Sequence, residues 1–140
     1  MGFRGNFEHT LDDRGRVAIP AKYRSEFAAG AVLTPSTDGC LQVYTEADFK
    51  KMSDEVASRP ATVRVGRQAR RLFDAMAFDA ELDRQGRILV PSRFREQLGL
   101  NGTVVIVGTR ECLEIWRPEA WEKELEDSRT ALSAGQEPVD

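Results

Sequence analysis

Two stretches of the chain decide its fold, because one repeats the other. Residues 11–24 read LDDRGRVAIPAKYR, and residues 82–95 read LDRQGRILVPSRFR, at a constant offset of 71 residues. The match resumes at an offset of 72, where CLQVY at 40–44 aligns with CLEIW at 112–116. Similarity of this length at a fixed spacing indicates a duplicated unit. We therefore expect two copies of one small fold within the 140 residues.

Each copy predicts the same succession of short elements. A strand leads into a tight turn, where Gly15 or Gly86 supplies the positive φ, and a short β-branched strand follows. Pro20 or Pro91 takes the first position of a two-turn helix, which Gly99 ends in the second copy. Two further strands and an acidic amphipathic helix complete each copy. The expected strands are 6–11, 17–19, 31–34, 41–44, 88–90, 103–107 and 113–116, and the expected helices are 21–27, 46–57, 92–98 and 118–128.

A basic segment joins the two copies. Pro60 is expected to open a helix that runs to about Met76, with Val65, Ala69 and Leu72 on one face and arginines on another. The expected organisation is a first unit at 3–57, a basic helical linker at 58–78, a second unit at 79–128 and a disordered tail at 129–140.

One copy alone is too small to hold a stable core. A unit of roughly 50 residues with four short strands buries too little apolar surface to fold independently. Two copies in one chain can interleave their strands around a shared core. We therefore predict an α+β fold, mainly β, in which two tandem swapped-hairpin units form an intramolecular pseudo-dimer barrel with short flanking helices.

The charge is segregated along the chain. The net charge is −3, yet residues 58–95 hold nine arginines against four acids, and residues 111–140 hold nine acids against three bases. Residues 1–24 are also basic, with five bases against three acids. This pattern permits a basic face for an anionic partner and an acidic flank turned away from it. Charged helix faces that are simply solvated would give the same composition.

The composition excludes most histidine- and cysteine-based active sites and metal sites. His9 is the single histidine, and Cys40 and Cys112 are too few for a disulfide scaffold or a zinc site. A cysteine hydrolase using His9 is arithmetically possible, but both cysteines occupy one repeat position before a strand, which favours buried packing. Trp116 and Trp121 match Tyr44 and Phe49 and are expected to be core or interface aromatics. We predict no enzymatic activity, no metal, no cofactor and no small-molecule substrate.

Membrane insertion and secretion are not expected either. No apolar run approaches the roughly 18 residues of a membrane span. No basic segment followed by an apolar stretch opens the chain, so we predict a cytoplasmic protein without a membrane partner.

The repeated residues also carry a family resemblance. Phe3-Arg4-Gly5, the motif Leu-Asp-x-x-Gly-Arg-x-x-x-Pro-x-x-x-Arg at 11–24 and at 82–95, and Arg70-Arg71-Leu72-Phe73 between the copies resemble the MraZ family of bacterial regulators, made of two SpoVT–AbrB-type units. The resemblance covers the chain from Phe3 to about Glu126. It implies AbrB-like swapped hairpins and a ring-shaped homo-oligomer. It further implies a nucleoid-associated regulator that binds short direct repeats in promoter DNA, upstream of the division and cell-wall gene cluster and its own gene.

The resemblance assigns roles to the residues of the two turns. The family's Asp-x-x-x-Arg signature falls on residues 12–16 and 83–87. The short helices that follow the turns are expected to bring further cations within reach of the DNA backbone. The expected DNA-binding residues are Arg14, Arg16, Arg84 and Arg87 in the turns and Lys22, Arg24 and Arg93 on the helices, with Arg95 in the equivalent position to Arg24. Asp12, Gly15, Asp83 and Gly86 are expected to orient the motif. Gln85 stands where the first copy has Arg14, so the second turn is expected to be less basic and to contribute less. Gly2 lengthens the usual start of the family by one residue.

Each assignment has a structural alternative. Asp12 and Arg16 can form a salt bridge that clamps the turn or pairs the two halves. The lysine and arginines of the short helices can be solvated surface. The linker arginines Arg64, Arg67, Arg70 and Arg71 can form a second basic patch, but we favour packing against the acidic helices of a neighbouring subunit. The alternative function is an antitoxin-like or scaffold module whose acidic C-terminal segment binds a protein partner.

Overall fold

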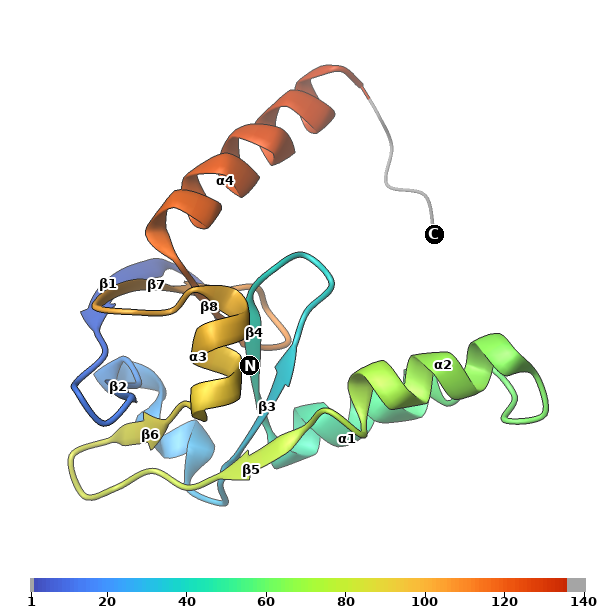
Figure 1. Cartoon of the computed structure of the whole chain (residues 1–140), viewed down its shortest axis with the longest axis horizontal. Helices are drawn as coiled ribbons and strands as arrows, with labels where there is room; N and C mark the ends of the chain where they lie inside the picture. The colour runs from blue at the N-terminus through green and yellow to red at the C-terminus, as the bar shows by residue number, and fades with distance from the viewer. Residues whose placement is uncertain (1, 136–140) are drawn as a thin grey trace.

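The computed structural model describes residues 2–135, whose strands form two sheets (Figure 1). Six strands form one sheet in the order β1-β7-β8-β4-β3-β5, and β2 pairs with β6 in a separate ribbon. The strands are β1 Asn6–Thr10, β2 Arg16–Ala18, β3 Ala31–Pro35, β4 Leu41–Thr45, β5 Phe78–Ala80, β6 Arg87–Leu89, β7 Thr103–Gly108 and β8 Leu113–Trp116. The helices are the 3-10 helix η1 Ala21–Phe27 and the α-helices α1 Glu46–Val56, α2 Arg64–Phe73, α3 Ser92–Leu98 and α4 Pro118–Ser133.

The two copies interleave their strands, as the sequence predicted. β1 of the first copy pairs with β7 of the second, and β5 of the second pairs with β3 of the first. At the centre β4 pairs with β8, and Gln42 lies opposite Glu114. In the ribbon Val17 lies opposite Ile88. These partners are equivalent residues of the repeat, so an approximate twofold axis relates the two copies.

The closed barrel that we expected is not seen. Within the described residues the six strands form an open sheet with β1 and β5 at its edges. β2 and β6, which a barrel would include, pair with each other outside that sheet. The strands that follow the two turns therefore make a separate two-stranded layer.

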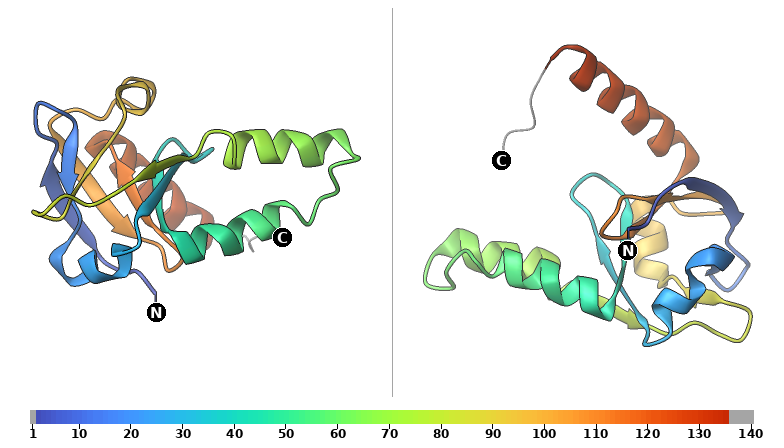
Figure 2. Two further views of the ribbon diagram at one scale, coloured as in Figure 1. Left: turned by 90° about the horizontal axis from the view of Figure 1, so that it is seen from below. Right: turned by 180° about the vertical axis from the view of Figure 1, so that it is seen from behind.

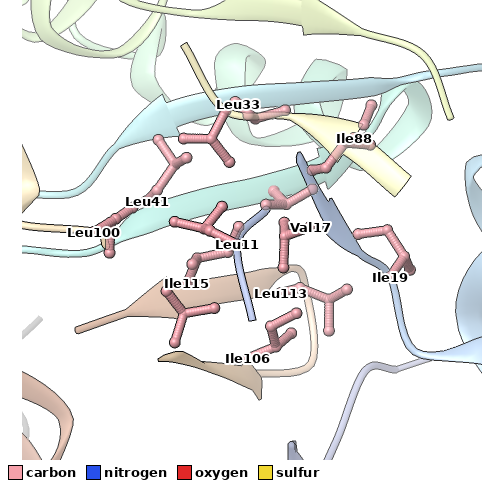
Figure 3. Packing of buried hydrophobic residues seen from close by; sticks show 14 of the residues in the cluster. Leu11, Val17, Ile19, Leu33, Leu41, Ile88, Leu100, Ile106, Leu113 and Ile115 are labelled. Carbon is pink, nitrogen blue, oxygen red and sulfur yellow. The ribbon is translucent and has the colours of Figure 1, made fainter. Parts of the chain in front are cut away.

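The core lies between the sheet and the ribbon. Val17 and Ile88, the central pair of the ribbon, are both fully buried. Figure 3 shows them packing with Leu33, Ile106 and Leu113 of the sheet. Because the ribbon contributes one strand from each copy, the apolar core is common to both. Burial of this kind fixes the positions of the turns that precede β2 and β6.

The short helices differ from expectation at their ends. Pro20 and Pro91 have extended ψ values of 134° and 144°, so each caps its helix instead of taking the first helical position. Gly99 adopts the left-handed conformation at φ 65° and ends α3, as predicted. The first copy has Ala28 after its helix, and the Ala28 N–H donates to the Ser25 carbonyl in a tighter 3-10 geometry.

The linker helix is shorter than predicted. α2 begins at Arg64 instead of Pro60, because the chain turns at residues 60–63 and the Val63 N–H donates to the Pro60 carbonyl. Gly66 packs directly on that carbonyl, where a Cβ would clash. The helices α1 and α2 run antiparallel and form an arm that projects from the sheets (Figure 2).

The C-terminal helix is longer than predicted. α4 projects from the sheets (Figure 1) and extends to Ser133, so the expectation of disorder from residue 129 was wrong. Residues 129–132 contain no glycine or proline, and Gly135, at φ 73°, follows the helix end. The rest of the predicted tail, 136–140, lies outside the described residues. No helix in the described part of the chain has the length and apolar character to span a membrane.

Candidate nucleic-acid interface

The first turn is built around the carboxylate of Asp12. Its Oδ1 accepts the N–H groups of Arg14 at 2.9 Å and Arg16 at 2.8 Å. The Asp12 carbonyl accepts the Gly15 N–H at 3.0 Å, and Gly15 has a φ of 83°, which favours glycine. Aspartate is suited to this position because its short side chain can accept from the backbone two residues ahead.

The second turn repeats this geometry. Asp83 Oδ1 accepts the N–H groups of Gln85 at 2.9 Å and Arg87 at 3.0 Å. The Asp83 carbonyl accepts the Gly86 N–H at 3.0 Å, and Gly86 has a φ of 75°. The four residues expected to orient the motif therefore form the two turns.

Each aspartate also holds the following arginine. Arg16 Nε lies 2.8 Å from Asp12 Oδ2, and Arg87 Nε lies 3.0 Å from Asp83 Oδ2. Hydrogen bonds from the Arg16 backbone hold the pKa of Asp12 below its usual 3.8, and those from Arg87 do the same for the pKa of Asp83. The salt bridge that the sequence left as an alternative is therefore present in both copies. It fixes the direction of each guanidinium and leaves both side chains partly exposed.

The ribbon brings the two turns together. The Ile19 N–H donates to the Gly86 carbonyl at 2.9 Å, and the Val90 N–H donates to the Gly15 carbonyl at 2.8 Å. Arg87 Nη1 reaches across to Asp12 Oδ2 at 3.4 Å. These contacts join residues 67 or 75 positions apart in sequence and place the two turns side by side.

The two turns differ in side-chain chemistry. Arg87 Nη2 donates to Gln85 Oε1, a bond that the first turn cannot form because Arg14 takes the equivalent position. The prediction that the second turn is less basic was wrong, because Arg84 stands where the first turn has Asp13. Each turn holds two arginines, but the first turn holds two aspartates and the second only one, so the second turn is the more basic.

The other candidate cations lie in three kinds of surroundings. Arg14 and Arg84 are exposed at the turns. Lys22 and Arg93 are exposed on the short helices, where Lys22 lies 5.0 Å from the Tyr23 ring centroid and Arg93 lies 4.8 Å from that of Phe94. Arg24 and Arg95 are half-buried and donate to backbone carbonyls of their own copy. Sequence reasoning did not find this internal role, because the pattern Pro-x-x-x-Arg does not show where the side chain points.

The cysteines lack the properties of a nucleophile. Cys40 and Cys112 are buried, and burial raises the pKa of both thiols, that of Cys112 to about 11. At neutral pH both are thus thiols instead of the reactive thiolate. Burial, together with the charge of Arg24, lowers the pKa of His9, which lies on β1. The predicted packing role of the two cysteines is confirmed.

Two of the four linker arginines bond to backbone carbonyls of the arm, and the other two are exposed on its surface without such a bond among the described contacts. Arg70 Nη2 donates to the Ala57 carbonyl at 3.1 Å, at the C-terminal end of α1, where a cation is favourable. Arg67 Nη1 donates to the Ala61 carbonyl at 2.9 Å. Arg64 and Arg71 are exposed. The arm therefore carries positive charge on a surface separate from the two turns.

The fold and the site define a tandem-repeat protein that presents two aspartate-held arginine turns on one surface. The family described as "MraZ protein, putative antitoxin-like" matches residues 2–72 and again residues 73–138. A relative from Caldanaerobacter subterraneus subsp. tengcongensis, named "Transcriptional regulator MraZ", is 41% identical over 119 residues, or 85% of this chain and 83% of that protein. A relative of the same name from Roseiflexus castenholzii is 39% identical over 134 residues, or 94% of each chain. The chain belongs to the MraZ family.

Proposed function

We propose that this protein is a transcriptional regulator that binds double-stranded promoter DNA through its two arginine turns. The names of its relatives support a regulatory role. The observation that carries the proposal is that Arg16 and Arg87, each held by an aspartate, lie on the two paired strands of one ribbon, Arg16 opposite Leu89 and Arg87 opposite Ala18. Guanidinium groups fixed in this way suit bidentate contacts to guanine or phosphate.

The surrounding residues fit an anionic ligand. The exposed Arg14, Arg84, Lys22 and Arg93 provide further contacts to phosphates. The carboxylates of Asp12 and Asp83 bond to the turns themselves, so their charge is offset by the arginines beside them. We assign these two aspartates to orienting the arginines, since a carboxylate that faced phosphates would be repelled.

A single protomer is expected to bind weakly. Its two turns offer a small surface, and the net charge of −3 provides no long-range attraction to DNA. A contact of this size falls near the non-specific range of roughly 10⁻⁴–10⁻⁶ M. Useful affinity therefore requires several linked copies, for which effective concentration gives a gain of about 10²–10⁴.

We further propose that the swapped-hairpin units assemble into a ring by contact between the basic arm and an acidic groove of the next protomer. The helix α2 carries four arginines and no acids. A groove of about 740 Å³ lies between α3 and α4, where the acidic lining residues outnumber the basic Arg117 and Lys123. The acids are Asp38, Glu96, Glu119, Glu124 and Asp127. The two surfaces differ, so their pairing is head-to-tail and closes into a ring when the rotation allows.

Binding to DNA fragments with different numbers of boxes tests the proposal. The probe is the region upstream of the encoding gene, with one, two or three of its direct repeats at native spacing. We expect affinity to rise steeply with the number of boxes and to fall when two boxes are moved apart by about half a helical turn. Comparable affinity for one box and for three, or indifference to the half-turn shift, would rule out the ring mechanism.

The family description and the projecting acidic helix support a second candidate, an antitoxin-like module that binds a protein partner. The two functions predict different sensitivities. Substitutions in the turns should abolish promoter binding if the protein is a DNA-binding regulator. If α4 binds a partner instead, those substitutions should have no effect on the protein's cellular activity, and removal of α4 should abolish it.

A further inference from the structure

Two arginines in equivalent positions of the repeat point into the protein. Arg24 Nε donates to the Ile19 carbonyl at 2.9 Å, and Arg95 Nε donates to the Val90 carbonyl at 3.0 Å. Both side chains are half-buried, whereas Lys22 on the same helix as Arg24 is exposed. The helix arginines therefore bond to the backbone of the chain, whereas Lys22 and Arg93 lie over aromatic rings at the surface.

Each of these guanidinium groups covers the turn of the other copy. A Cβ placed on Gly15 would lie 2.5 Å from Arg95 Nε and 2.7 Å from its Cζ. A Cβ placed on Gly86 would clash in the same way with Arg24. Arg95 of the second copy thus packs on the backbone of the first turn. Arg24 of the first copy packs on the backbone of the second turn.

A chain of hydrogen bonds makes the same crossed connection. Val90 accepts from Arg95 through its carbonyl and donates its N–H to the Gly15 carbonyl at 2.8 Å. Ile19 links Arg24 to Gly86 by the equivalent bonds, with 2.9 Å between the Ile19 nitrogen and the Gly86 carbonyl oxygen. Two independent contacts therefore join each arginine to the opposite turn.

We propose that Arg24 and Arg95 are positioning residues, each of which holds the turn of the other repeat in its binding conformation. The consequence for DNA rests on the function proposed above. Arg95, although it belongs to the second copy, supports Arg16 in the first turn. Arg24 supports Arg87 in the second turn. Neither copy can then form a complete DNA-binding turn without its partner.

Hydrogen exchange of backbone amides in the free protein tests the positioning role without DNA. We expect Arg95→Ala to accelerate exchange at Gly15 and Arg16, and Arg24→Ala to accelerate exchange at Gly86 and Arg87. Loss of one ordinary hydrogen bond corresponds to roughly two- to tenfold faster exchange. Acceleration in the turn of the substituted copy alone, equal acceleration in both turns, or no acceleration would overturn the proposal.

Titration with the upstream DNA fragment provides the second measurement. Arg95→Ala should weaken binding more than Arg24→Ala, because the first turn is the one whose arginine lacks a glutamine acceptor. If the two arginines instead contact phosphate directly, both variants will reduce the salt dependence of binding while exchange in the free protein stays unchanged. If wild-type protein does not bind the fragment, the proposed function fails, while the crossed exchange pattern still tests the positioning role.

Two further variants guard against loss of the fold. Arg24→Lys and Arg95→Lys keep the charge but remove the planar group that lies over the glycine. We expect each lysine variant to accelerate amide exchange in the turn of the opposite copy, but less than the alanine variant does. If both lysine variants are folded and neither shows this acceleration, the proposal is contradicted. Ser25→Ala, an exposed position beside Arg24 on η1, is the matched control and should leave exchange in both turns unchanged.

Discussion

The first and second turns have the same backbone, but their arginines have different neighbours. Arg16 is held by Asp12 alone among the described residues, whereas Arg87 contacts Asp83, Asp12 and Gln85. The copies also differ behind the turns. The hydroxyl of Tyr23 bonds both the N–H and the carbonyl of Arg4, each at 2.9 Å, whereas the second copy has Phe94 in that position.

The two copies therefore keep one turn geometry while the side chains around it differ. The backbone bonds that form the turn come from aspartate and glycine, which are identical in both copies. The side chains that set the reach of each arginine come from positions that differ. We therefore expect the first turn to dominate DNA recognition and the second to be held closer to the protein.

The largest expected difference is between Arg16→Ala and Arg87→Ala. Arg16→Ala should abolish specific DNA binding and leave the fold and the oligomer intact. Arg87→Ala should cost less, because Arg87 already donates to Gln85 and Asp12. Each lost bidentate base contact costs about 1–3 kcal/mol of binding free energy. Because every protomer of an oligomer carries the substitution, the loss is repeated at each bound box. Gel-shift titration beside size-exclusion chromatography measures both, and equal losses would show that the two turns contribute alike.

Tyr23→Phe tests the asymmetry behind the turns, since it gives the first copy the side chain of the second. It removes two hydrogen bonds to the Arg4 backbone, each with a net contribution of about 0.5–1.5 kcal/mol. We expect destabilisation on the order of 1–2 kcal/mol in denaturant unfolding. DNA affinity of the folded variant should be unchanged, because Tyr23 is buried and its hydroxyl bonds to Arg4 instead of to either turn. Unaltered stability would indicate that these bonds are replaced by water.

Gln85→Ala should have a smaller effect of opposite sign. Removing the acceptor releases Arg87 Nη2 toward the ligand, so DNA affinity should rise by a few-fold, corresponding to less than about 1 kcal/mol. Gln85→Glu is the matched control, because its carboxylate holds Arg87 more firmly and should lower affinity. Fluorescence anisotropy with the upstream fragment measures both. A fall in affinity for Gln85→Ala would mean that the glutamine orients Arg87 for binding.

The smallest expected effect is on the pH dependence of the two turns. The pKa values of Asp12 and Asp83 are lowered, so the stability from their ionised forms is present above about pH 4 and is lost as pH falls through the folded-state values. Between roughly pH 5 and 8 neither carboxylate should alter DNA affinity. Carboxyl chemical shifts measured by NMR should titrate below 3.8 for both residues. A midpoint above that value would show that the clamps do not persist in solution.

The sequence by itself determined the duplication, the order of the elements and the composition of the two turns. It did so because these features depend on local chemistry. Glycine at positive φ, aspartate that accepts from the backbone, and β-branched strands leave a signal within a few residues. Equivalent residues related by the repeat also pointed to interleaved strands, since a small unit cannot bury its apolar face alone.

The tertiary structure decided where the long side chains go. Arg24 and Arg95 could have been solvated, could have contacted phosphate or could have packed inside, and the sequence pattern is the same for all three. Their destination depends on Gly86 and Gly15 of the opposite copy, which only the pairing of β2 with β6 brings within reach. The bond between Gln85 and Arg87 likewise depends on side-chain directions. Contacts between residues far apart in sequence depend on how the two copies pack around the shared core. They therefore cannot be predicted from a local sequence pattern.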